Sequence, residues 1–126
     1  MATLRLTRRA LIDLKEIKKY SIEKHGTITA EKYLASIEDA LVTIKEYPEI
    51  LKDRPFAQYA KFYFVGKHTL VFAVLDNTIY VLTVKYGGMD IENIINRFEP
   101  TLMQEAEIMH KRLRKAVKVK AEINNI

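Results

Sequence analysis

Residues 61–84, KFYFVGKHTLVFAVLDNTIYVLTV, decide how this 126-residue chain folds. They contain three short runs of apolar, β-branched and aromatic residues, a composition that is typical of strands. Gly66-Lys67 and Asp76-Asn77 separate the runs, and residue pairs of this kind suit tight hairpin turns. The stretch therefore predicts three consecutive antiparallel strands.

Two amphipathic helices are expected before these strands. Residues 2–6 alternate well enough for a short first strand, and Thr7 can cap the following helix through its hydroxyl. Gly26 ends the first helix and Pro48 ends the second, so the pair should form an antiparallel hairpin with one apolar face. The apolar positions that recur at helical spacing are Leu11, Leu14, Ile17 and Ile22 in the first helix, and Ala30, Tyr33, Leu34, Ile37, Leu41 and Ile44 in the second.

Helices are also expected after the strands. Gly87-Gly88 predict a turn with positive φ, and Asp90 can cap a short helix that follows it. Pro100 interrupts that helix. A capping box then opens a last helix over residues 101–121, which we expect to pack back on the domain.

The order of these elements predicts an α+β fold. An antiparallel sheet (β-α-α-β-β-β) carries the helix hairpin on one face, with an extra C-terminal helix. The length suits one domain. We assign residues 1–98 to this domain and residues 99–126 to a C-terminal helical extension.

Composition narrows the functions that the chain can have. It has no cysteine, and its three histidines lie far apart in the sequence, so neither a metal site nor a cofactor is expected. No apolar run approaches a membrane span, and no signal region follows Met1, which together predict a cytoplasmic protein without a membrane partner. The net charge of +5 suits an anionic partner such as nucleic acid, the ribosome or an acidic protein.

The same residues, in this order, resemble the RelE/ParE superfamily of toxins, also called plasmid stabilisation proteins. The first helix carries Ala10, Asp13 and Leu14 before Gly26, like the family's opening helix. The last strand precedes a Gly-x-x-Asp segment that ends at Asp90, and the resemblance extends over about residues 3–95. It implies the toxin of a type II toxin–antitoxin system, with a cognate antitoxin as partner and either a dimer or a toxin–antitoxin hetero-oligomer as the assembly.

Toxins of this superfamily divide into two functional kinds. Those resembling RelE cleave mRNA on the ribosome, and those resembling ParE block DNA gyrase and are not nucleases. The helix hairpin favours the second kind and the basic strands favour the first, so the resemblance leaves both targets open. Where the related nucleases carry an arginine after the histidine, and a histidine and tyrosine at the end of the last strand, this chain has Thr69, Gly87 and Gly88. An arginine that many relatives carry before the aspartate is Met89 here. A non-toxic protein- or nucleic-acid-binding module on the same fold is therefore a third alternative.

Candidate site residues follow from the needs of RNA cleavage. The reaction needs a base, an acid and a cation for the phosphorane charge. Lys85 and Tyr86 at the end of the last strand, with His68 before the preceding one, are the catalytic candidates. The alternative for each is a structural role, such as a half-buried tyrosine or a surface histidine. The candidate nucleic-acid-binding residues are Lys61, Lys67, Arg112, Arg114 and Lys115.

Overall fold

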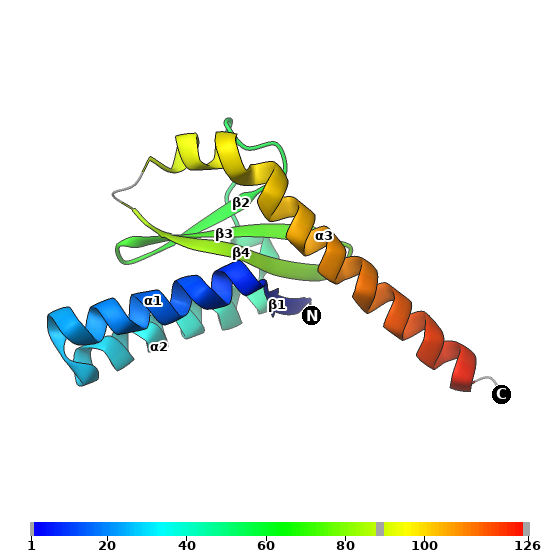
Figure 1. Ribbon diagram of the computed structural model, residues 1–126, viewed down its shortest axis with the longest axis horizontal. Coiled ribbons are helices and arrows are strands. Elements are labelled where there is room, and N and C mark those ends of the chain that lie inside the picture. Colours follow the sequence, from blue (N-terminus) through cyan, green and yellow to red (C-terminus); the bar gives the residue numbers. More distant parts are fainter. Residues whose placement is uncertain (1, 88–89, 125–126) are drawn as a thin grey trace.

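The fold consists of a four-stranded sheet with helices on both faces (Figure 1). The computed structural model describes residues 2–87 and 90–124, with side chains as far as residue 116. The strands lie in the order β1-β4-β3-β2. The elements are β1 (Thr3–Leu6), α1 (Arg8–His25), α2 (Thr27–Glu46), the 3₁₀ turn η1 (Pro48–Ile50), β2 (Lys61–Val65), β3 (His68–Leu75), β4 (Thr78–Tyr86) and α3 (Ile91–Asn124).

The sheet differs from the prediction in one pairing. β2, β3 and β4 form the expected antiparallel meander, but β1 pairs with β4 in parallel, with Thr3 opposite Thr78 and Leu6 opposite Val81. Parallel neighbours need a long crossover connection, which the helix hairpin and the first two strands of the meander provide here. Alternation along a strand carries no information about strand direction, so the sheet is mixed where a wholly antiparallel one was expected.

Alternating side chains of the sheet contribute to two separate cores. Figure 1 shows α1 and α2 on one side of the sheet and α3 on the other. The hairpin-side core joins sheet residues such as Leu70 and Phe72 to the buried face of α1 and α2. The α3-side core joins Val71, Tyr80 and other residues of the opposite face to the first half of α3. Both faces of the central strands are therefore buried, which explains why these strands are almost continuously apolar.

The predicted helix hairpin and its caps are confirmed. The Thr7 side-chain oxygen accepts a hydrogen bond from the Ala10 N–H at 3.2 Å. Gly26, with φ of +84°, is the single residue between α1 and α2, a conformation that glycine adopts without strain. The expected apolar face of α1 is wrong at one position, because Leu11 is 45% exposed while Asp13 is buried. Asp13 is buried because the face of α1 that packs on β4 contacts backbone groups, such as the Val84 N–H, as well as apolar side chains.

The two expected C-terminal helices are one continuous helix. The Asp90 cap is confirmed, since its Oδ1 accepts the Asn93 N–H at 3.1 Å. However, α3 then continues past Pro100, so a separate helix opening at Thr101 is wrong. Proline removes one hydrogen bond and kinks a helix without always ending it. The yellow first turns of α3 run in a different direction from the orange turns in Figure 1.

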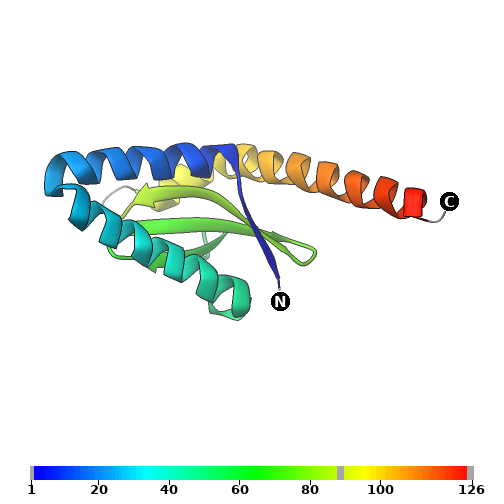
Figure 2. The same ribbon diagram turned by 90° about the horizontal axis from the view of Figure 1, so that it is seen from below.

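Packing on both sides of Pro100 keeps α3 continuous. Ile95 precedes the proline and Met103 and Ala106 follow it, and all three are buried against the sheet. Beyond this contact α3 projects away from the sheet, so the expected packing of residues 101–121 on the domain holds only for their first part (Figures 1 and 2). The helix also crosses the boundary between residues 98 and 99, and that division of the chain stays a prediction.

Glu99 ties α3 to the loop that leads into β2. Its Oε1 accepts the Gln58 N–H at 3.2 Å, and its Oε2 accepts the N–H groups of Tyr59 and Ala60 at 3.1 and 2.8 Å. One nearly buried carboxylate thus satisfies three successive backbone donors that no strand partner reaches.

We expect Glu99→Gln to lower the free energy of unfolding by about 1–3 kcal/mol, because the amide turns a donor towards backbone N–H groups that need an acceptor. Denaturant titration followed by circular dichroism measures this change. Glu107→Gln, at an exposed position of the same helix, is the control and should change stability by less than about 0.5 kcal/mol. Equal stability of the two variants would show that the carboxylate does not hold the loop.

Candidate functional site

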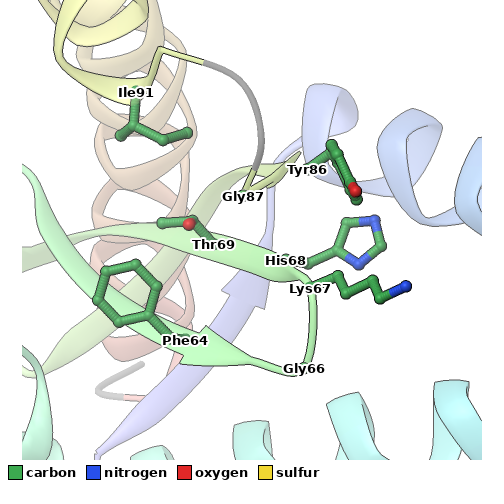
Figure 3. Close-up of a pocket in the computed structure, with 8 residues that line it drawn as sticks. All are labelled: Phe64, Gly66, Lys67, His68, Thr69, Tyr86, Gly87 and Ile91. Atoms are coloured by element: carbon green, nitrogen blue, oxygen red, sulfur yellow. The ribbon is translucent and has the colours of Figure 1, made fainter.

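An open pocket of about 400 Å³ lies where the β2–β3 turn meets the end of β4 (Figure 3). Its two sides differ in character. Lys67, His68 and Tyr86 project to one side of the strands, whereas Phe64 and Thr69 lie on the other. The full lining consists of Phe64, Gly66, Lys67, His68, Thr69, Tyr86, Gly87 and Ile91. The pocket therefore combines aromatic, cationic and apolar groups.

Two glycines shape this pocket for different reasons. Gly66 has a φ of +54° in the β2–β3 turn, and a Cβ there would lie 2.7 Å from the Tyr33 ring. Gly87 does not have the positive φ that was expected. Its N–H instead donates to the Lys67 carbonyl at 2.6 Å, and a Cβ would lie 3.0 Å from that oxygen. Gly87 is thus needed for close approach of two chain segments, while Gly88 lies outside the described residues.

The structure brings together His68 and Tyr86, two of the three catalytic candidates. They are opposite residues of the β3–β4 pair, and their ring centroids lie 5.9 Å apart. The sequence prediction missed a third aromatic group, Tyr33 of α2, whose hydroxyl lies 2.5 Å from His68 Nδ1. Burial lowers the pKa of His68, so the imidazole is neutral at physiological pH and one of its nitrogens is held by Tyr33.

Thr69 adds an unsatisfied polar group to the same pocket. Thr69 is 1% exposed, and its hydroxyl has no hydrogen-bond partner among the described residues. Buried hydroxyls are usually paired with protein or water. The Thr69 hydroxyl is therefore a group that a bound molecule in this pocket could satisfy.

Lys85, the remaining catalytic candidate, does not line the pocket. Its ammonium lies 3.9 Å from the Oδ1 of Asp13, a buried carboxylate on α1. Arg9 lies 3.6 Å from the same oxygen. Asp13 also accepts hydrogen bonds from the Thr83 hydroxyl and the Val84 N–H. The position of Lys85 therefore serves charge balance around Asp13.

The candidate nucleic-acid-binding residues do not form one surface. Lys67 borders the pocket, whereas Lys61 pairs with Asp53 at 2.8 Å on the outer strand β2. Arg112, Arg114 and Lys115 lie on the projecting part of α3, at the end of the molecule away from the pocket (Figure 1). The residues that the sequence predicts to bind nucleic acid therefore lie in separate regions of the molecule.

The described residues hold neither a metal-binding cluster nor a membrane-spanning helix. In residues 2–87 and 90–116, no group of three or more histidine, aspartate or glutamate side chains could hold a metal ion. Within the described part of the chain, no helix is long and apolar enough to cross a membrane.

A helix hairpin packed on a sheet of order β1-β4-β3-β2, with an open pocket at the end of the meander, defines the RelE/ParE-like class of folds. A sequence model of the ParE toxin of the type II toxin–antitoxin system parDE matches residues 4–91. The chain belongs to this family of toxins, which confirms the resemblance read from the sequence.

A solved structure described as a chromosomal ParDE toxin–antitoxin system from P. aeruginosa has a similar fold. The TM-score is 0.61 at 20% sequence identity, and the match covers 68% of this chain and 96% of that chain. No curated protein matches the sequence. The similarity supports the fold and shows that nearly a third of this chain has no counterpart in that structure.

The lowered pKa of His68 predicts how the free energy of unfolding depends on pH. Because burial lowers this pKa below the ordinary 6.5, the folded protein binds a proton at His68 more weakly than the unfolded chain does. Stability should therefore fall as the pH drops below about 6.5. We expect His68→Gln to flatten this fall, as measured by denaturant unfolding at a series of pH values. His25→Gln, at an exposed position at the end of α1, is the control and should retain it. An unchanged pH profile in His68→Gln would contradict the assignment.

Proposed function

We propose that this protein is a growth-arresting toxin that acts by blocking DNA gyrase. The observation that carries the proposal is the family match over residues 4–91, which spans the helix hairpin and all of the sheet except the first residue of β1. The family is that of ParE toxins, and the resemblance to ParE implies gyrase as the target.

The geometry of the pocket supports a target other than RNA. Cleavage of RNA needs a cation placed at the phosphate together with an acid and a base. The Lys85 ammonium is directed to Asp13, and His68 shares a hydrogen bond with Tyr33. Of the candidate residues, Lys67 and Tyr86 keep exposed side chains beside the pocket. These two exposed side chains alone do not supply the acid, base and cation that RNA cleavage needs at one phosphate.

Ribosome-dependent mRNA cleavage is the second candidate, favoured by one observation. His68, Tyr86 and Lys67 lie together at the pocket although they come from a turn and two strands. A neutral imidazole beside a tyrosine hydroxyl can exchange a proton with a ribose hydroxyl. On this alternative the protein is an enzyme, and on the gyrase proposal it is an inhibitor.

The double variant His68→Gln, Tyr86→Phe distinguishes the two targets. Under the gyrase proposal it should arrest growth as fully as the wild type and inhibit DNA supercoiling by purified gyrase equally well. Under the ribonuclease alternative, mRNA cleavage should fall by roughly ten- to a thousandfold. Pulse labelling of DNA and protein synthesis after induction, at matched protein levels, follows the arrest in cells. An immediate block in translation that the double variant relieves would overturn the gyrase proposal.

The non-toxic binding module remains the third candidate, and expression tests it directly. Normal growth at a high level of soluble protein, in a host that lacks the antitoxin, would favour the module over both toxic activities. In that case the next measurement is to identify the protein or nucleic acid that the module binds.

An antitoxin is the proposed protein partner, as type II systems and the P. aeruginosa ParDE structure suggest. The outer strand β2 offers an edge for it. The backbone of Phe62 is bridged to Lys52 on this edge. Two residues further along β2, Phe64 is 52% exposed. An extended segment of a partner can pair with such an edge. Whether the complex is a simple heterodimer or a larger hetero-oligomer is a separate prediction.

We expect an acidic antitoxin to bind at a rate that falls as salt rises, because the net charge of +5 attracts it at a distance. Stopped-flow mixing with the product of the neighbouring small gene, at increasing ionic strength, measures the association rate. Co-expression should also restore growth. An association rate that does not depend on salt would contradict the electrostatic part of this proposal.

A further inference from the structure

The projecting half of α3 has no role in the toxin fold as the family defines it. The family match ends at residue 91, where α3 begins, and the similar solved structure leaves nearly a third of this chain unmatched. The part of α3 beyond residue 110 also leaves the sheet (Figures 1 and 2). A function of this segment therefore goes beyond the growth-arresting activity.

A cluster at the β3–β4 turn fixes the point where α3 leaves the sheet. His110 Nε2 lies 2.6 Å from the Asp76 carboxylate, and His110 Nδ1 lies 2.9 Å from the Tyr80 hydroxyl. The hydrogen bond from His110, with the charges of His110 and Arg114, lowers the pKa of Asp76 and keeps it ionised. Both imidazole nitrogens thus anchor the helix, so the segment that follows is held at a defined angle.

The segment after this anchor is strongly and uniformly basic. Residues 108–120 contain no aspartate or glutamate. At about 100° per residue, the four described cations fall within an arc of about 160° on one side of the helix. The cations in this stretch are Lys111, Arg112, Arg114 and Lys115, followed in the sequence by Lys118 and Lys120.

This basic face is open to solvent. Lys111, Arg112 and Lys115 are exposed, and no described carboxylate forms an ion pair with any of them. The opposite face of the helix carries Ala106, which is buried on the sheet, and Leu113, which is half-buried. The cations are therefore not used to hold α3 in place.

We propose that the basic face of α3 binds the phosphate backbone of nucleic acid. Adjacent cations on a rigid, projecting helix can neutralise successive phosphates without any base contact. A membrane surface fits less well, because an amphipathic helix binds a bilayer by inserting a continuous apolar face, whereas the buried apolar side chains of α3, such as Met103 and Ala106, pack on the sheet. An acidic protein fits less well, because protein interfaces depend on a buried apolar or aromatic centre, and in residues 101–116 of α3, whose side chains the structure describes, Ile108 is the one large apolar side chain exposed.

The test measures binding of labelled duplex DNA and of single-stranded RNA by fluorescence anisotropy at low salt. The variant Lys111→Gln, Arg112→Gln, Lys115→Gln removes three cations of the basic face and keeps Arg114 beside Asp76. Its matched control is Lys15→Gln, Lys18→Gln, Lys19→Gln, which removes three exposed cations from α1. Both variants carry the same net charge and keep good helix formers.

We expect the α3 variant to raise Kd at least tenfold and the α1 variant to raise it less than threefold, as rough bounds for local against long-range charge. The slope of log Kd against log salt should also fall by roughly 2–3 in the α3 variant, because each lost phosphate contact removes about 0.7–0.9. Preference between DNA and RNA identifies which polymer is bound.

Three results would overturn the proposal. The first is that the wild-type protein binds neither DNA nor RNA. The second is that both variants lose the same amount of nucleic-acid affinity, and the third is that the wild-type protein binds anionic lipid vesicles in preference to nucleic acid. Growth arrest by the α3 variant is measured in parallel. Arrest that persists after loss of nucleic-acid binding separates this surface from the toxic activity, whereas the absence of arrest in the wild type bears only on the proposed toxin function.

Discussion

The fold depends on a buried carboxylate at the uncovered part of a strand edge. β1 pairs with β4 only as far as Val81, so the rest of that edge has no strand partner. Asp13 of α1 accepts the Val84 N–H at 3.1 Å and the Thr83 hydroxyl, and Thr7 bonds two further carbonyls of β4. Because buried backbone groups need partners, α1 takes the place that a longer β1 would occupy. This contact fixes the helix hairpin against the sheet.

The same carboxylate determines what the end of β4 can do. A buried charge is costly unless a partner compensates it, and Arg9 and Lys85 both lie within 4 Å of Asp13 Oδ1, at 3.6 and 3.9 Å. Lys85, which the sequence places beside the candidate site, therefore stabilises the fold by compensating the charge of Asp13. The neighbouring residue, Tyr86, points instead towards His68 and the pocket. Adjacent residues of one strand thus divide between stability and function, because successive side chains leave a strand on opposite sides.

Local signals in the sequence predict the local parts of the structure. The Thr7 and Asp90 caps, the turn at Asp76-Asn77 and the helix hairpin all depend on residues close together in the chain. The short turn predicts that β3 and β4 pair as antiparallel strands, but a bulge between Val71 and Phe72 shifts the register by one residue and so brings His68 opposite Tyr86. Features that join distant segments could not be predicted in this way. Tyr33 belongs to an apolar helical stripe that reads as core, and only the fold places its hydroxyl against His68. The continuity of α3 through its proline is likewise decided by packing on the sheet.

The length of α3 exceeds what the sheet requires. β4 has nine residues and spans about 30 Å, and the twenty helical residues 91–110 span about the same length. Residues 111–124 of α3 add a further 14 residues, a length of about 21 Å. The composition changes at the same place, because Glu105 and Glu107 precede His110, whereas the charged residues between His110 and residue 120 are all cations. A helix that merely covered apolar surface would not need a uniformly basic continuation past its anchor. The two changes coincide at His110, and this coincidence is the physical basis for the proposed contact of the projecting segment with nucleic acid.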